Sequence, residues 1–282
     1  MACGCGPPEN GTERAVEIRV EDLHKGFGGR PVLSGVDLEI RRGEIVALVG
    51  GSGAGKTVLL DHLVGLLLPD SGRTLVADHN LPGEPLVDLA TLDEAGMDRV
   101  RQHLALVFQK NALLSGTVFQ NIALWLKEKT DLDAAEIYER VRESLDAVGF
   151  EGDDAILTKR RGELSGGMAK RVAVARAIAM RPAIIFYDEP TTGLDPQSAA
   201  KIHELICSTR DAAWRAGAIQ TTIIITHDKD LLHRLRPRIV MLFQGKVFFD
   251  GPYEEFERSD SEIIRPYFEL MPILNQAAVA EK

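Results

Sequence analysis

The stretch "GGSGAGKT", from Gly50 to Thr57, decides the fold of this chain. It fits the pattern G-x-x-x-x-G-K-[ST], and the apolar run "EIVALVG" that leads into it predicts a short buried strand. The leucines after it recur at a helical period, which predicts a helix from about Lys56 to Leu67. A glycine-rich turn between a buried strand and a helix is the setting of a phosphate-binding loop.

The residue types in this loop suit a nucleotide. Glycines allow consecutive backbone N–H groups to point at phosphate oxygens, and the start of the helix adds positive potential. We expect Lys56 to reach the β- and γ-phosphates of ATP and the Thr57 hydroxyl to ligate Mg²⁺. The predicted nucleotide-binding stretch consists of Gly50, Gly51, Ser52, Gly53, Ala54, Gly55, Lys56, Thr57 and Val58. The alternative is a glycine-rich turn with a solvent-exposed lysine.

The composition limits the class of protein. The chain has 282 residues, of which 45% are hydrophobic and 27% charged, as in globular proteins with a sizeable core. Its formal net charge of -9 argues against a general nucleic-acid binder, which would carry a basic face. No apolar run approaches the roughly 18 residues that cross a bilayer, and we expect a cytoplasmic protein.

Short apolar strands alternate with helical segments, which predicts an α/β fold with a mostly parallel sheet covered on both faces. Residues 111–160 have a helical pattern and are interpreted as an insertion. There Asp133 and Glu136 are spaced as a capping box, and Gly149 is placed to close the helix. Near the end of the chain, "RIVMLFQGKVFFDG" predicts a hairpin turning at Gln244–Gly245, and prolines allow only a short helix after residue 259.

Two acids follow a second apolar strand in "AIIFYDEP". The strand end places Asp188 beside the phosphate-binding loop, where it would hold the hydration shell of Mg²⁺. Glu189 is then positioned to orient or deprotonate the attacking water. Phosphoryl transfer needs positioning and charge stabilisation more than covalent chemistry, so this small set suffices. The alternative is an acidic pair that caps a strand end at the surface.

Three single residues are weaker candidates. Gln109 and His227 each follow an apolar strand, so Gln109 is placed to sense the γ-phosphate or a water on Mg²⁺, and His227 to contact the γ-phosphate. Phe27, in "HKGFGGRPVL", is a candidate for stacking on adenine. Taken alone, each is better explained as a loop polar group or a core aromatic, and only their occurrence together favours a nucleotide site.

The stretch "GELSGGMAKR" suggests a second phosphate contact. Ser165 is a good N-cap residue, and Gly166 and Gly167 expose the first N–H groups of the helix that follows. Since one loop already binds the phosphates, a second anion site predicts a sandwich of two copies, each closing on the ATP of the other. The alternative is an N-cap without a ligand.

In order along residues 16 to 255, the set "FGG", "GGSGAGKT", "FQ", "LSGGM", "IIFYDE", "GLD" and "THD" resembles an ATP-binding cassette (ABC) ATPase subunit. The resemblance implies a P-loop NTPase core with an N-terminal antiparallel β subdomain and a helical subdomain at about 110–180. It makes Asp195 the D-loop acid that contacts the partner subunit. The signature usually ends in Gln, whereas Met168 stands here, which places the phosphate contact on Ser165 and the backbone.

The resemblance also fixes the expected roles and boundaries. Glu189, His227 and Lys56 are expected to be catalytic, and Thr57, Gln109 and Asp188 to hold Mg²⁺. The nucleotide contacts also include Phe27, Gln109, Ser165, Gly166, Gly167 and Asp195. We divide the chain into a disordered tail at 1–14, an ATPase domain at 15–255 and a C-terminal extension at 256–282.

"GKTVLL", "FQKNALLSGTVFQNIA" and "LSGGMAKRVAVARAIA" are similar to ATPases of Mla-type lipid transporters, which work with MCE-domain proteins. That resemblance implies a homodimer on the cytoplasmic face of a bacterial inner membrane, bound to two permease subunits and moving phospholipid between membranes. The alternatives are the ATPase of another ABC importer or exporter, and a cassette that acts outside transport. The last class usually has a long coiled coil or a second cassette with a basic linker, and neither is visible here.

Overall fold

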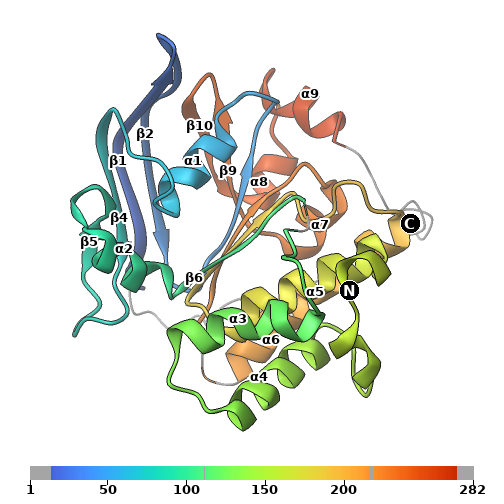
Figure 1. Cartoon of the computed structure of the whole chain (residues 1–282). Helices are drawn as coiled ribbons and strands as arrows, with labels where there is room; N and C mark the ends of the chain where they lie inside the picture. The colour runs from blue at the N-terminus through green and yellow to red at the C-terminus, as the bar shows by residue number, and fades with distance from the viewer. Residues whose placement is uncertain (1–13, 111, 216, 218, 272–282) are drawn as a thin grey trace.

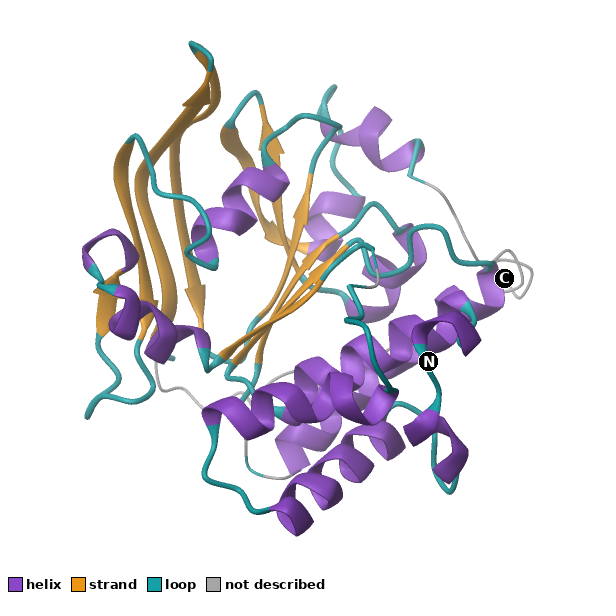
Figure 2. Cartoon of the chain, viewed as in Figure 1, coloured by secondary structure: helices purple, strands orange, loops and turns teal. Residues whose placement is uncertain are grey.

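Two β-sheets with helices between and beside them form the structure, a computed structural model that describes residues 14–110, 112–215, 217 and 219–271 (Figures 1 and 2). The expected tail at 1–14 therefore lies, except for Arg14, outside the described residues. The first sheet is antiparallel, in the order β2-β1-β4-β5. Its strands are β1 (Val16–Phe27), β2 (Arg30–Arg41), β4 (Ser71–Ala77) and β5 (Leu86–Asp88).

The second sheet has the order β10-β9-β3-β8-β7-β6. All neighbours are parallel except β9 and β10, which form the predicted hairpin. The strands are β3 (Ile45–Val49), β6 (Leu104–Val107), β7 (Ile184–Asp188), β8 (Thr221–Ile225), β9 (Arg238–Phe243) and β10 (Lys246–Pro252). The predicted α/β class is confirmed. Because parallel strands share one carboxyl edge, the segments after β3, β6, β7 and β8 meet there.

Alternation along the strands divides the core into layers, because successive side chains point to opposite faces. Ile184 and Phe186 of β7 pack in the cluster between the two sheets, where helix α1 (Lys56–Leu63) lies. Ile185 and Tyr187 pack on the opposite face against the long helices. The phosphate-binding loop thus connects a largely buried strand, β3, with a helix whose leucines pack in this core.

The helices on that opposite face come mainly from the middle of the chain (Figure 1). They are α3 (Val118–Lys129), α4 (Ala134–Ala147), α5 (Gly166–Ala179) and α6 (Pro196–Arg215), with short helical turns at Asp154–Thr158 and Arg161–Glu163. A further short turn at Leu89–Thr91 belongs to the core between the sheets. The predicted capping box of α4 is present. The Asp133 side chain accepts the N–H of Glu136 at 2.9 Å, and the Glu136 side chain accepts the N–H of Asp133. Gly149 follows the helix with φ 80°.

One predicted boundary is wrong. Helix α1 ends at Leu63 rather than near Leu67, because Gly65 adopts a left-handed φ of 68° and the chain turns back on itself. The N–H of Leu66 donates to the Asp61 carbonyl at 2.7 Å, which closes the helix. Leu66 fits the helical period but is 55% exposed. Strand β5 and helix α2 (Glu94–Arg101) complete this part of the chain.

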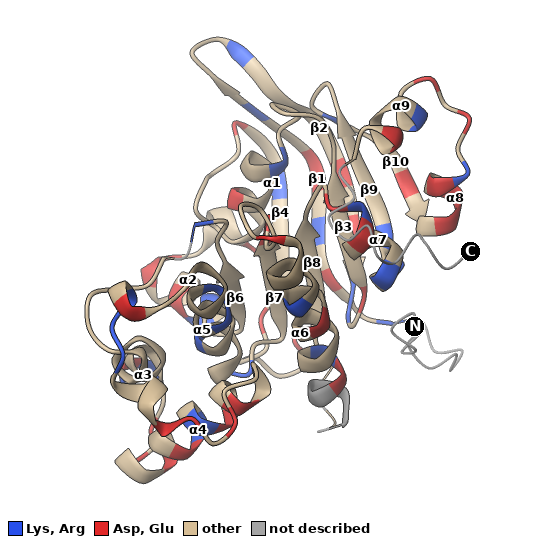
Figure 3. Ribbon diagram, turned by 90° about the vertical axis from the view of Figure 1, so that its right-hand side faces the viewer, with Lys and Arg blue, Asp and Glu red and all other residues tan. Residues whose placement is uncertain are grey.

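The C-terminal part covers the β3–β9 side of the second sheet. Helices α7 (Lys229–Leu235), α8 (Tyr253–Glu257) and α9 (Ile264–Glu269) are all short, as the prolines predicted for the last. Phe256 and Phe268 pack against Val49 and Met241 in a separate cluster. Acidic and basic residues are interspersed along the ribbon, and α8 is rich in acids (Figure 3). Within the described ranges, no helix combines the length and the apolar character that crossing a membrane requires.

Candidate nucleotide site

The phosphate-binding loop takes a shape that only glycine allows at two positions. Gly50 has φ 144°, and a Cβ on it would lie 2.4 Å from the Leu242 carbonyl oxygen. Gly55 has φ 98° and would place a Cβ 2.7 Å from the Leu33 side chain. The backbone therefore passes tightly between its neighbours before α1 begins. Gly55 offers no side chain to cap that helix, so its first amides are left for an anion.

The side chains of the loop divide into exposed and packed groups. Gly51, Ser52, Gly53 and Thr57 are exposed, whereas Ala54 and Val58 pack partly against the core between the sheets. Any contact of these two with a nucleotide would therefore run through their backbone amides.

Lys56 is folded back onto its own loop. Its ammonium donates to the carbonyl oxygens of Gly50 at 2.7 Å and Gly51 at 3.1 Å. Burial lowers the pKa of Lys56, while the nearby carboxylates of Glu189 and Asp188 raise it again. The lysine thus lies within electrostatic reach of both predicted acids, and an arriving phosphate would take the place of two neutral carbonyls.

Asp188 and Glu189 stand where β7 ends. Burial raises the pKa of Asp188, and the neighbouring carboxylates of Glu189 and Asp61 raise it further. A divalent cation would relieve this crowding of negative charge, and the oxygen donors of Asp188 and Thr57 are the hard ligands that Mg²⁺ prefers. Asp61, on α1, was missed by the sequence analysis, because only the fold brings it to Asp188.

His227 contacts Glu189 directly. Its Nδ1 lies 2.8 Å from Glu189 Oε2, and because a carboxylate only accepts, Nδ1 carries the proton. This hydrogen bond raises the pKa of His227 against the opposing effect of burial. Glu189 also has φ 46°, a strained value for a residue with a side chain. Half of the His227 side chain remains exposed, so it is open to a ligand.

The signature turn begins α5 as predicted for an N-cap. Ser165 Oγ accepts the N–H of Met168 at 3.2 Å, while the Met168 side chain packs against the main core. A Cβ on Gly167 would lie 3.2 Å from Ser198 Oγ, and one on Gly166 would lie 4.0 Å from Leu194. The turn therefore lies beside the start of α6 in its own chain.

Asp195 also lies at the start of α6. It accepts the Ser198 N–H at 3.0 Å. The turn that begins α5 and Asp195 are thus brought together, since both lie beside Ser198.

Gln109 lies in an exposed segment after β6, and its position depends on a lysine that the sequence analysis missed. Lys170 of α5 is buried and donates to the carbonyl oxygens of Phe108 at 2.9 Å and Gln109 at 3.0 Å. Burial lowers the pKa of Lys170 to about 8, partly offset by Asp188. The stretch "MAKRVAVARAIA" contains Lys170, Arg171 and Arg176, and nothing in it distinguishes the buried lysine from the two arginines.

Phe27 stands apart at the end of β1. It is 49% exposed, and the ammonium of Lys25 lies 5.6 Å from its ring centroid. An exposed ring at a hairpin end can receive a flat base.

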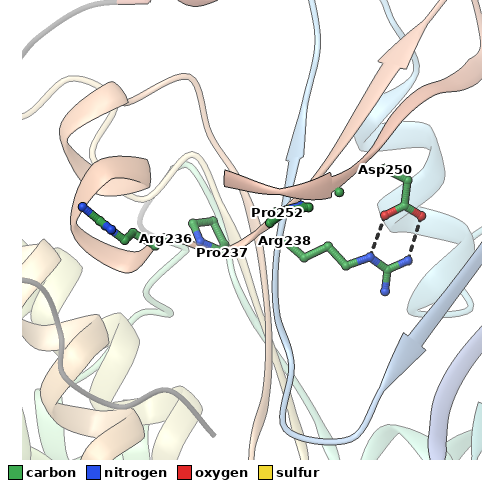
Figure 4. A pocket seen from close by; sticks show the side chains of 6 residues that line it. Arg236, Pro237, Arg238, Asp250 and Pro252 are labelled. Carbon is green, nitrogen blue, oxygen red and sulfur yellow. Dashed lines mark hydrogen bonds and ion pairs between the residues drawn. The ribbon is translucent and has the colours of Figure 1, made fainter. Parts of the chain in front are cut away.

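A hollow of about 530 Å³ lies elsewhere (Figure 4). It is lined by Arg236, Pro237, Arg238, Asp250, Gly251 and Pro252. Arg238 pairs with Asp250 through contacts of 2.6 and 2.7 Å, so its charge is already satisfied. Because Arg238 stands opposite Val46 at the amino end of β3, the hollow is at the other edge of the sheet from the phosphate-binding loop.

Comparison with known proteins gives consistent results. The family model described as "ABC transporter" matches residues 33–192. The "Protein TRIGALACTOSYLDIACYLGLYCEROL 3, chloroplastic" of Arabidopsis thaliana is 33% identical, over 92% of this chain and 76% of its own. The "Methionine import ATP-binding protein MetN" of Caulobacter vibrioides is 37% identical, over 84% of this chain and 68% of its own.

A solved structure agrees with these relatives. The dimeric ATP-binding cassette MJ0796, in a post-hydrolysis state bound to ADP and Pi, superposes with a TM-score of 0.71 and 27% identity, covering 84% of this chain and 98% of that one.

A glycine-rich loop between β3 and α1, facing two acids at the end of β7, defines a P-loop NTPase. The matched residues make up more than half of this chain. The chain belongs to the ABC transporter family and is an ATPase, an ATP-binding motor subunit of a transport system.

Proposed function

We propose that the chain powers the movement of lipid between membranes, as one of two ATPase copies bound to two permease subunits on the cytoplasmic face of a bacterial inner membrane, with an MCE-domain protein as further partner. The signature "LSGGM" and the segments flanking it support the lipid cargo through their resemblance to Mla-type ATPases. So does the relative at 33% identity whose name contains that of a galactolipid.

The mechanism follows from the groups at the carboxyl edge of the sheet. The loop amides and Lys56 bind the triphosphate, with Lys56 leaving the Gly50 and Gly51 carbonyls. Glu189 orients the attacking water and takes its proton, and His227, released from Glu189, donates to the γ-phosphate. Thr57 and Asp188 would hold Mg²⁺, with Gln109 facing its hydration shell, and the cation supplies charge neutralisation when bound.

The signature turn acts on the other copy. Ser165 and the amides after it contact the triphosphate held by the partner, and Asp195 lines the same contact between subunits. A hydrogen bond to such a charged group contributes about 1.5–3 kcal/mol, so ATP favours the closed pair and hydrolysis favours opening. The dimeric cassette at 27% identity supports this arrangement.

The contact between Glu189 and His227, placed beside Lys56, is the observation that carries the ATPase mechanism. The test is transfer of a fluorescent phospholipid between two vesicle populations by the complex purified with its permease. We expect ATP to stimulate transfer, and Lys56→Ala to abolish both transfer and hydrolysis. Hydrolysis that persists in Lys56→Ala would contradict the site, and ATP-independent transfer would contradict the motor role.

A second candidate is an importer of small solutes, which the methionine-import relative at 37% identity favours. The two cargoes are separated by what stimulates hydrolysis in the reconstituted complex. Phospholipid presented on an MCE-domain protein should do so for a lipid transporter, and a solute on a soluble binding protein should do so for an importer.

A further inference from the structure

The C-terminal part of the chain returns to the phosphate-binding loop. The Tyr267 hydroxyl, on α9, accepts the N–H of Gly50 at 2.9 Å and donates to the carbonyl oxygen of the same residue at 3.3 Å. Tyr267 follows Gly50 by 217 positions and lies outside the region that matches the family model. A single side chain therefore satisfies both backbone groups of the first glycine in the loop.

Gly50 is the point where several constraints on the loop meet. Its carbonyl oxygen, which Tyr267 contacts, also accepts the ammonium of Lys56 at 2.7 Å. A Cβ on Gly50 would strike the Leu242 carbonyl on the β9 side. Gly50 is thus held by β9 on one side and by Tyr267 on another, and a shift of this residue would shift the anchor of Lys56.

Helix α9 has the packing needed to hold the hydroxyl in place. Ile264 and Phe268 are buried among Tyr253, Phe256 and Met241. The Lys229 ammonium lies 4.0 Å from the Phe268 ring centroid, a cation–π contact. Lys229 begins α7 two residues after His227, so α9 touches both the phosphate-binding loop and the base of the segment that carries the histidine.

The chemical state of the hydroxyl suits this position. Burial raises the pKa of Tyr267, the Gly50 hydrogen bond opposes this, and the carboxylate of Glu189 raises it further. The hydroxyl stays protonated at neutral pH, so it both donates and accepts. The effect of Glu189 also puts Tyr267 within electrostatic reach of the acid at the end of β7.

We propose that Tyr267 is a positioning residue of the ATPase: it fixes Gly50 so that the loop amides are preorganised for the triphosphate, and it makes the C-terminal segment part of the nucleotide site. Tyr267 acts through Gly50 and makes no contact with the reacting atoms. The inference rests on the proposed role of the loop and of Lys56.

The test compares two tyrosines of the same cluster in the full chain. Tyr267→Phe keeps the ring and removes the hydroxyl from Gly50. Tyr253→Phe is the matched control, because its buried hydroxyl contacts Glu257 at 2.9 Å instead of the loop. We expect Tyr267→Phe to weaken binding of a non-hydrolysable ATP analogue and to raise KM about tenfold, with kcat at saturating ATP nearly unchanged, because preorganisation acts on binding. Tyr253→Phe should bind as the wild type does.

Hydrogen exchange at the Gly50 amide is the second measurement, because it reports directly on the hydrogen bond that Tyr267→Phe removes. The amide should exchange faster in Tyr267→Phe and at the wild-type rate in Tyr253→Phe. Wild-type affinity in Tyr267→Phe, or equal loss in both variants, would overturn the inference. If Lys56→Ala loses turnover in that case, the proposed site stands and only the role of Tyr267 falls; if Lys56→Ala retains turnover, both fall.

Discussion

The contact between Glu189 and His227 keeps the expected general base occupied while no nucleotide is bound. Glu189 is strained at φ 46°, and its Oε2 atom faces His227 Nδ1 at 2.8 Å. The histidine thereby engages the carboxylate oxygen that would otherwise contact the attacking water. A γ-phosphate offers His227 a second acceptor, which frees Glu189 at the moment when ATP is bound.

Replacing Glu189 by Gln should separate ATP binding from hydrolysis. The amide is isosteric but a poor base, so ATP contacts remain while water activation is lost. We expect Glu189→Gln to reduce turnover by about 10²- to 10⁴-fold, the usual contribution of a general base, and to retain ATP. Size-exclusion chromatography with ATP should show a stable dimer, and a monomer that still binds ATP would contradict the sandwich. Glu163→Gln, at the surface before the signature turn, serves as the control.

Helix α5 shows why a methionine is tolerated in the signature turn. The group of residue 168 that meets Ser165 is its backbone N–H, whereas the thioether packs toward the core. The hydrogen bond to Ser165 therefore does not depend on which side chain stands at residue 168.

Two substitutions at the start of α5 should differ in their effect on ATPase activity. Met168→Gln keeps the backbone donor, so we expect ATPase activity near that of the wild type. Ser165→Arg removes the cap, which costs about 1 kcal/mol of helix stability. It also places a long side chain where the partner's triphosphate should enter, so we expect it to block ATPase activity. The measurement is the steady-state ATPase rate at saturating ATP. Loss of activity in Met168→Gln alone would refute this account of the turn.

A buried network joins α6 to the segment after β8. Asp228 accepts from His203 Nε2 at 2.7 Å, from Thr191 Oγ1 at 2.8 Å and from the Leu231 N–H at 3.1 Å. Although burial raises the pKa of Asp228, these bonds hold it below its usual range. Asp228 directly follows His227, so the network fixes the segment from which the histidine projects.

Truncating His203 should loosen this connection. His203→Ala leaves Asp228 buried with a partner missing, and we expect a loss of about 2–3 kcal/mol in the free energy of unfolding and a lower kcat. His203→Gln retains an N–H donor and should recover part of both. Urea denaturation and ATPase assays on the same samples measure the two effects. A stability of His203→Ala equal to that of the wild type would show that the bond to Asp228 contributes nothing.

Local features were predictable from sequence, and contacts between distant segments were not. The Asp133 and Ser165 caps involve residues three positions apart, so spacing alone identifies them. The sheet strands were recognisable as short apolar runs. Lys170 and Tyr267 were missed because their partners lie 61 and 217 positions away. The error at the end of α1 had a different cause, since Gly65 overrode a leucine period that continued past it.

At the scale of the whole molecule, two neighbouring histidines beside the antiparallel sheet give stability a pH dependence. The rings of His79 and His103 lie 5.3 Å apart. The hydrogen bond to Glu17 raises the pKa of His79 against burial, with Glu84 adding to the rise and Arg42 opposing it. Burial, followed by the charge of His79, lowers the pKa of His103.

These opposite shifts predict maximal stability of this region near pH 6.5, the ordinary pKa of about 6.5 for histidine being the reference. Above it, the folded state keeps a proton on His79 that the unfolded state has lost, so stability falls as pH rises through the raised pKa. Below it, His103 binds a proton in the unfolded state but not in the folded state, because its folded pKa is lowered, so stability falls as pH drops. Urea unfolding between pH 5 and 8 measures both limbs. His79→Gln should flatten the upper limb, and an unchanged upper limb would exclude His79 as its source.

The strand order of the second sheet has a consequence for how the chain is made. β3 lies between β8 and β9, so the strand that leads into the phosphate-binding loop obtains both of its hydrogen-bonded neighbours only after residue 243 has left the ribosome. Until then, its backbone has no strand partner, and Ala47 and Val49 lack the later residues against which they pack. The antiparallel sheet at the start of the chain can assemble during synthesis, whereas the half that will hold ATP must wait. During that wait, "IVALV" is the natural stretch for a chaperone to cover.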